Sequence, residues 1–130
     1  MKIEVIVLDK PAIKYRNLVM ERAFGLSKLL PKKGVIEVYL ISGKRMLALN
    51  KKFRGKNKST NVLSFAAPKN FPGNKLGEVY LDPLYIQKHK EDLALMLAHG
   101  VLHILGYDHE KKNDRIRMEK KEKALWRKII

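Results

Sequence analysis

Three histidines in the C-terminal third of the chain have a spacing that suits metal binding. His99 and His103 are four residues apart, so on a helix their rings project from one face, about 6 Å apart along the axis. Gly106 can end such a helix in the left-handed conformation and let the chain bring His109 back to that face. Three imidazoles can hold one Zn²⁺ ion and leave a fourth position open, which is typical of catalytic zinc sites. The pattern therefore predicts a catalytic metal centre.

An alternative for these side chains is a hydrogen-bonded place in the core. Burying two imidazoles in so apolar a helix is costly unless both are satisfied, and a third at a suitable offset favours a metal. Nickel, copper and cobalt also bind imidazoles, so zinc is the expected ion among several divalent transition metals. Asp108, beside His109, could orient that ligand or move a proton, or it could cap the turn; both roles stay open.

The spacing H-x-x-x-H-x-x-G-x-x-H also matches the metzincin metalloproteases. Those enzymes carry a Glu after the first His, which acts as the general base. Here that position is Gly100, which cannot accept a proton. A protease is therefore disfavoured, and we expect Gly100 to let another backbone segment pack closely against the helix.

A basic segment upstream could bind phosphate. Between residues 44 and 58 there are seven basic residues and no acidic one. Arg54 lies where a predicted helix meets a loop, and its planar guanidinium could bind a phosphate through two parallel hydrogen bonds. Lys51, Lys52 and Lys56 are further candidates for substrate contacts, with a solvated helix face as the alternative.

The composition points in the same direction. The 130 residues include 28 Lys and Arg against 13 Asp and Glu, a net charge of +15, and such an excess favours a polyanionic partner, nucleic acid before a membrane surface. A lysine-rich, thermophile-like surface would explain many charges, but not an excess of one sign. The absence of Cys excludes disulfide scaffolds and cysteine-ligated zinc. No apolar run is long enough to cross a bilayer and the N-terminus is typical of a strand, so we expect a cytoplasmic protein.

Hydrophobic periodicity predicts the elements that position these residues. Strands are expected at residues 3–7, 35–41, 62–65 and 77–81, and helices at 14–30, 44–53, 91–105 and 113–129. Ser42 is expected to cap the second helix, and the inward side chains of that helix are expected to be Met46, Leu47, Leu49 and Phe53. The last helix should dock through Ile116, Leu125 and Trp126. The prediction is a single α+β domain over residues 1–130, with one mixed, roughly four-stranded sheet packed with helices and a metzincin-like histidine site on the central, apolar helix.

Four segments resemble those of a known family. Residues 99–109, HGVLHILGYDH, are similar to the signature of the YbeY endoribonucleases, which mature bacterial rRNA. Upstream, LNKKFRGK at 49–56, TNVLSF at 60–65 and LGEV at 76–79 resemble further family segments in the same order. One position departs from the pattern, because Asn61 stands where the family usually has Asp, which removes a negative charge there.

The resemblance implies a zinc-dependent endoribonuclease that prefers single strands and acts in 16S rRNA 3′-end maturation and ribosome quality control. It also implies His99, His103 and His109 as metal ligands and Arg54 as the residue on the phosphate side. The expected partners are 16S rRNA and the ribosome or small-subunit proteins, with no membrane and no small-molecule cofactor. The rival hypothesis is a zinc-stabilised factor that binds rRNA or the ribosome without cutting.

Overall fold

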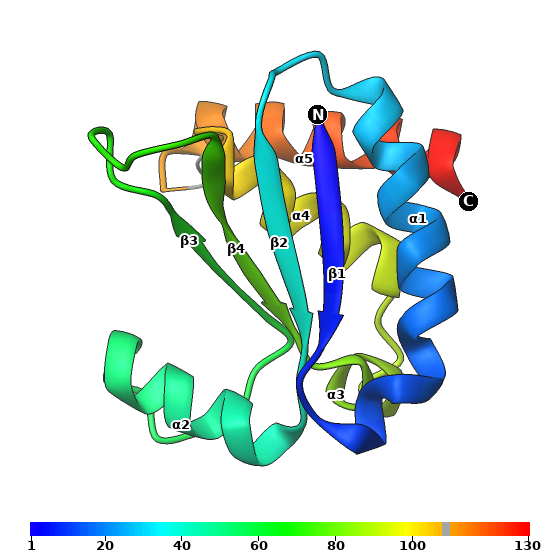
Figure 1. The fold of residues 1–130 in the computed structure, drawn as a ribbon, viewed down its shortest axis with the longest axis vertical. Helices are drawn as coiled ribbons and strands as arrows, with labels where there is room; N and C mark the ends of the chain where they lie inside the picture. Colours follow the sequence, from blue (N-terminus) through cyan, green and yellow to red (C-terminus); the bar gives the residue numbers. More distant parts are fainter. Residues whose placement is uncertain (108–109) are drawn as a thin grey trace.

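One mixed sheet forms the centre of the molecule (Figure 1). The computed structural model describes residues 1–107 and 110–130. Its strands are β1 (Lys2–Val7), β2 (Val35–Leu40), β3 (Val62–Ala66) and β4 (Lys75–Leu81). In space the order is β1-β2-β4-β3; β1, β2 and β4 run parallel, and β3 is antiparallel to β4 at one edge. This confirms the predicted α+β class and its four-stranded mixed sheet.

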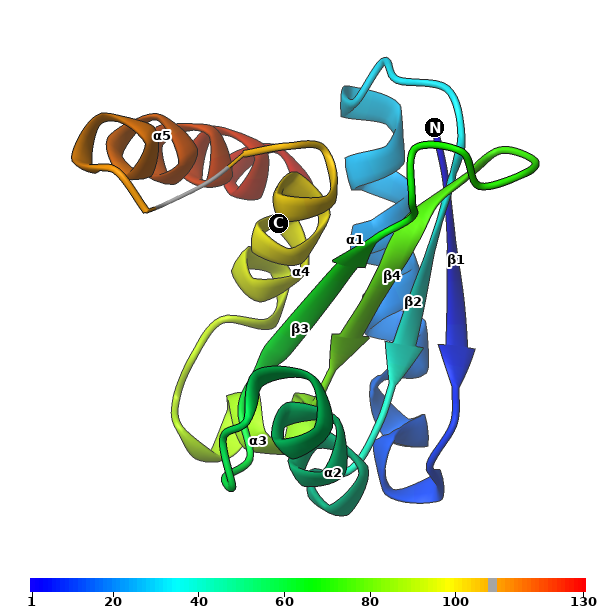
Figure 2. The same cartoon turned by 90° about the vertical axis from the view of Figure 1, so that its left-hand side faces the viewer.

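The helices are distributed unequally around the sheet. They are α1 (Arg16–Leu29), α2 (Gly43–Arg54), α3 (Pro83–Lys88), α4 (Leu93–Ile104) and α5 (Lys112–Ile129), with a 3₁₀ helix, η1 (Lys10–Tyr15). Figure 2 shows α4 between the sheet and α5, on the same side as α1, whereas α2 lies at the end of the sheet where the parallel strands terminate. None of the helices in the described ranges has the length and apolar character needed to cross a membrane.

The core lies between the sheet and α4. Alternate residues of β2 and β4 point toward the helices and are buried, and α4 contributes buried side chains around most of its circumference. Burial on so many sides explains why this helix is apolar almost throughout. The buried set includes Ile36, Val38, Leu40, Val79, Leu81, Leu97, Val101 and Leu102. The predicted path of this helix through the core is therefore confirmed.

Two elements were not predicted. Residues 10–15 form η1, so the predicted helix at 14–30 begins as an α-helix only at Arg16. The pair Asp82 and Pro83, which follows the predicted strand at 77–81, starts α3: the Asp82 carboxylate accepts the Tyr85 backbone N–H at 3.1 Å, and proline suits the first helical position. A similar cap by Asp92 starts α4 at Leu93 rather than at residue 91.

Several predicted docking residues face solvent instead. In α2, Met46 is buried and Leu49 is half-buried, but Leu47 and Phe53 are exposed. A helix at the end of a sheet covers only a narrow strip of it, here near Ile41 and Leu63. Only one side of α2 is therefore buried, and its other apolar side chains face solvent.

The last helix docks through two of the three predicted residues. In α5, Ile116 is exposed, whereas Leu125 is buried and Trp126 half-buried as expected. The buried side of α5 consists of Met118, Glu122, Leu125 and Ile129. Ile116 falls outside this stripe because helical geometry places it on another face.

The start of α2 is capped from another strand. Ser42 occupies the cap position, but its hydroxyl makes no cap bond, contrary to the prediction. Instead the Asp9 carboxylate, just after β1, accepts the Ser42 backbone N–H at 2.9 Å and binds the Arg45 guanidinium through two bonds of 3.0 and 3.1 Å. The bond to Arg45 holds the pKa of Asp9 below its usual value.

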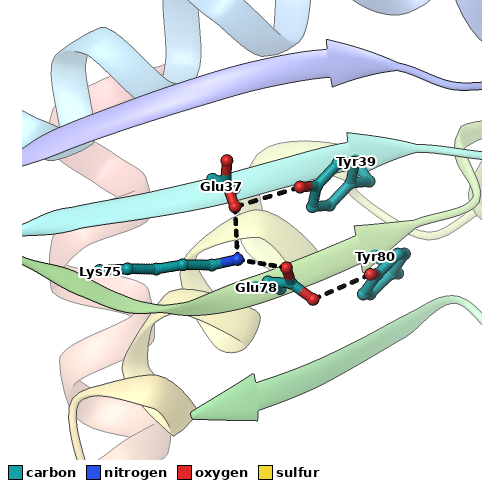
Figure 3. Close-up of polar contacts among 5 residues, drawn as sticks. All are labelled: Glu37, Tyr39, Lys75, Glu78 and Tyr80. Carbon is teal, nitrogen blue, oxygen red and sulfur yellow. Dashed lines mark hydrogen bonds and ion pairs between the residues drawn. The ribbon is translucent and has the colours of Figure 1, made fainter. Parts of the chain in front are cut away.

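The sheet face away from α1 and α4 carries a polar cluster (Figure 3). Glu37 and Glu78 are directly opposite each other on β2 and β4, which would be unfavourable without a counter-charge. Lys75 forms ion pairs with both carboxylates. The Tyr39 hydroxyl donates a hydrogen bond to Glu37, and the Tyr80 hydroxyl donates one to Glu78. Burial, followed by the bond to Glu78, raises the pKa of Tyr80 to about 12.

Candidate functional site

Helix α4 brings two of the predicted ligands together. The His99 and His103 Nε2 atoms are 3.1 Å apart, and the ring centroids are 4.6 Å apart with the planes at 75°. Both rings are half-buried on the side of α4 that faces the start of β3. The spacing of four residues therefore places two imidazole nitrogens at one point, as a shared ion requires.

The rest of the predicted histidine motif is described only in part. Helix α4 ends at Ile104, and Gly106 has a positive φ of 98°, which glycine adopts readily. His109 and Asp108 lie outside the described residues. Within the described ranges no group of three His, Asp or Glu side chains could hold a metal, so this part of the chain supplies two of the three predicted ligands.

A buried glutamate holds one of the imidazoles in place. His99 Nδ1 is hydrogen-bonded to the carboxylate of Glu122 in α5, which is only 8% exposed. Because a carboxylate accepts, Nδ1 donates, and a neutral His99 then keeps the lone pair of Nε2 on the side of His103. A carboxylate behind a histidine is the usual support of a metal ligand.

Sequence reasoning did not single out Glu122. Its position carried a signal, however, because it lies four residues after Met118 and three before Leu125, in the apolar stripe that docks α5. A carboxylate in such a stripe requires a buried partner.

The two imidazoles and the carboxylate fit a divalent transition metal. The Nε2 atoms converge, the Nδ1 atom of His99 is engaged by a buried carboxylate, and the imidazole donors suit zinc and its neighbours. The residues that the structure describes are thus compatible with the expected ion.

An open pocket of about 490 Å³ connects the histidines to the predicted phosphate-binding arginine. It lies between α4, β3 and the loop before β3, and its wall includes Arg54, Thr60, Asn61, Ser64, His99 and His103. Arg54 is exposed at the end of α2, which stops there because Gly55 takes a left-handed φ of 68°. In the described part of the chain no carboxylate pairs with its guanidinium. Lys51, Lys52 and Lys56 are exposed but do not line the pocket.

Gly100 allows β3 and β4 to approach α4. A Cβ at this position would lie 2.8 Å from Val79 Cγ1 and 3.1 Å from Ser64 Oγ, and the Ser64 hydroxyl donates to the Gly100 carbonyl at 2.9 Å. The close neighbours are side chains, so the expected backbone approach is wrong in that detail. A glutamate would find no room here, which removes the position of the metzincin general base.

The neighbours of Asn61 explain why this position carries a neutral side chain and not an aspartate. Its Nδ2 donates to both carboxylate oxygens of Glu91 at 3.2 Å, while its Oδ1 accepts the Val62 backbone N–H at 2.7 Å. An aspartate would place a second negative charge against Glu91. Asn61 therefore ties the start of β3 to the segment before α4.

A family model and curated relatives name the same family for this chain. A family model described as endoribonuclease YbeY matches residues 9–130. The endoribonuclease YbeY of Ehrlichia canis is 34% identical over 131 residues, which cover 95% of this chain and 84% of that protein. That of Anaplasma marginale (strain Florida) is 43% identical over 100 residues, which cover 71% of this chain and 65% of that protein. The solution structure of a protein from Thermotoga maritima superposes with a TM-score of 0.60 at 26% identity, over 98% of this chain and 88% of the other.

Proposed function

Because this chain belongs to the YbeY endoribonuclease family, we propose that it is a metal-dependent endoribonuclease that cleaves single-stranded RNA. One observation carries the proposal: Arg54 and the two histidines of α4, more than forty residues apart in the sequence, line the same pocket. A cation able to bind phosphate beside a pair of potential metal ligands is an arrangement suited to phosphodiester cleavage.

The metal is part of the proposal. His99, His103 and His109 are the proposed ligands, and Glu122 orients the first of them. When bound, Zn²⁺ or a related ion supplies Lewis acidity toward the phosphodiester. Glu122 keeps the proton of His99 on Nδ1, which directs the lone pair of Nε2 toward His103.

Arg54 acts on the opposite side of the substrate. Its guanidinium binds the non-bridging oxygens of the scissile phosphate and stabilises their negative charge as the phosphorus–oxygen bond breaks. Its exposure and its lack of a carboxylate partner among the described residues leave these donors available for a phosphate.

The shape of the pocket supports single-stranded RNA as the substrate. The pocket is bounded by α4 on one side and by the edge strand β3 on the other, so a strand must bend to place a phosphate between Arg54 and the histidines. A rigid A-form duplex does not bend in this way. The charge of +15 supports RNA over a neutral ligand. In this proposal the protein acts in the cytoplasm on 16S rRNA 3′ ends and in ribosome quality control, with the ribosome or its small-subunit proteins as partners.

Substitution of the two sides of the pocket tests the activity. Arg54→Ala and His103→Ala are each expected to reduce cleavage of a single-stranded rRNA fragment by about 100-fold or more, since each removes a group that acts on the reacting phosphate. Arg16→Ala and His89→Ala are the matched controls, because both side chains are exposed outside the pocket. Undiminished cleavage by both pocket variants would refute the proposal.

Chelation separates this function from that of a non-catalytic binding factor. An enzyme is expected to lose cleavage in a chelator while its circular dichroism and its RNA affinity stay unchanged. Unfolding on chelation would instead favour the structural-metal alternative.

A further inference from the structure

A second hollow lies at the far end of β3 from Arg54. Its volume is about 410 Å³, and its walls come from the connection between α1 and β2 and from the hairpin between β3 and β4. These two loops project beside each other beyond the same end of the sheet (Figure 1). The first supplies Lys32 and Lys33, and the second supplies Lys69 and Phe71.

The hollow adjoins the catalytic pocket. Ala66, the last residue of β3, and Ile104, the last residue of α4, line both spaces. Ile104 directly follows His103. A chain that occupies the pocket and continues past Ala66 and Ile104 therefore reaches the hollow.

The side chains in the hollow suit a polyanion. Lys32, Lys33 and Lys69 are exposed, and no carboxylate of the described residues forms an ion pair with them. Lys75, at the same end of the sheet, differs in this respect because Glu37 and Glu78 neutralise it. Three unpaired ammonium groups around one hollow attract phosphates.

Phe71 adds an exposed aromatic ring to the hollow, which binding of a polyanion by charge alone does not need. Its side chain lines the hollow and is 44% exposed at the hairpin. An exposed aromatic ring among lysines is the usual platform for an unpaired base, because every base has a face that stacks. This favours RNA over an acidic peptide, which would need the charges but not the ring.

We propose that this hollow is an RNA subsite, which binds the nucleotides that continue beyond the scissile phosphate. Lys32, Lys33 and Lys69 contact successive phosphates, and Phe71 stacks on a base. The inference rests on the proposed function, since the same RNA strand occupies both spaces. It follows that an RNA long enough to reach the hollow binds more tightly than one confined to the pocket.

A charge-neutralised variant tests the subsite. Lys32→Gln/Lys33→Gln/Lys69→Gln keeps the length of three exposed side chains and removes their charges. Fluorescence anisotropy is measured with labelled single-stranded RNAs of about four and about twelve nucleotides, over a range of salt. The variant is expected to bind the longer RNA about tenfold more weakly, with a log–log salt slope reduced by about 2, or about 0.7 per phosphate contact. Its affinity for the shorter RNA should stay within about twofold of the parent.

The matched control removes three exposed lysines from η1 and α3, at the other end of the sheet: Lys10→Gln/Lys14→Gln/Lys88→Gln. It is expected to change the two affinities equally and only slightly. Phe71→Ala should weaken binding of the longer RNA by about fivefold, and Phe71→Trp should retain it.

The outcomes distinguish this inference from the proposed function. If the hollow variant binds the longer RNA as the control does, while the parent cleaves RNA, the subsite alone is refuted. If the variant instead loses binding to an acidic peptide, the partner of the hollow is an acidic peptide and not RNA. If the parent neither binds nor cleaves the longer RNA, both proposals fail.

Discussion

At the scale of single residues, Glu122 links the docking of α5 to the orientation of His99. It is a carboxylate in the buried stripe of α5, and its hydrogen bond to His99 Nδ1 satisfies two polar groups that would be costly to bury alone. The same bond decides which nitrogen of His99 faces the pocket. One side chain thus connects the stability of a helix interface to the state of a proposed metal ligand.

Glu122→Gln is expected to lower the affinity for Zn²⁺ by about 10- to 100-fold, because an amide orients and polarises the imidazole less well than a carboxylate. Competition with a chromophoric chelator measures this affinity, and circular dichroism checks that the variant folds. Glu119→Gln, on the exposed side of the same helix, is the control and should bind as the parent does. Equal affinities for the two variants would contradict the role assigned to Glu122.

At the scale of elements, a contact with the segment after β1 fixes the position of α2. The end of β1 supplies the cap for α2 through Asp9, and α2 in turn delivers Arg54 to the pocket at its other end. Helix α4 can approach the sheet because Gly100 has no side chain. The pocket therefore depends on how α2 and α4 are placed against the sheet. Asp9 fixes the start of α2, and Gly100 allows the close approach of α4.

The cap by Asp9 predicts a pH dependence. Because the bond to Arg45 holds the pKa of Asp9 below its unfolded value, the ionised carboxylate stabilises the fold above about pH 4 and loses this contribution as the pH falls through the lower, folded pKa. Asp9→Asn should lower the free energy of unfolding by about 1 kcal/mol at neutral pH and by almost nothing near pH 2.

Urea unfolding at the two pH values measures this difference. Glu21→Gln, an exposed acid of α1 whose contact with Arg22 is 3.6 Å long, should have little effect at either pH. A loss that is the same at both pH values would show that the charge of Asp9 does not matter.

At the scale of the whole molecule, the excess positive charge has opposite effects on stability and on binding. The chain carries +15 in 130 residues, and repulsion among these groups opposes compaction while it favours a polyanion. The lysines of the proposed subsite come from two loops, Arg54 from a helix end, and none of them has a carboxylate partner among the described residues. Their charges are thus available to bind RNA, and their mutual repulsion lowers the stability of the free protein.

Salt should therefore move two measurements in opposite directions. Raising NaCl from about 0.05 M to about 0.5 M screens repulsion and is expected to raise the thermal midpoint by a few degrees. The same change should weaken binding to single-stranded RNA by an order of magnitude or more. A midpoint that falls with added NaCl would mean that attractive surface pairs outweigh the net charge.

Local patterns in the sequence were enough to predict much of this protein. Periodicity over a few residues indicated the four strands and the apolar helix, and a spacing of four residues put His99 and His103 on one face. These properties depend on neighbours in the chain, because helix and strand geometry repeat over short distances. Helix α3, which was not predicted, also had a local signal, because Asp82 can cap a helix and Pro83 suits its first position.

Only the tertiary structure decided which distant residues meet. It placed Glu122 behind His99, Arg54 on the wall of the pocket that both histidines line, and the lysines of two loops around one hollow. None of these contacts follows from local periodicity, because each depends on the packing of elements far apart in the chain. Side-chain spacing along a helix is set by the backbone, whereas a pocket is set by the elements that surround it.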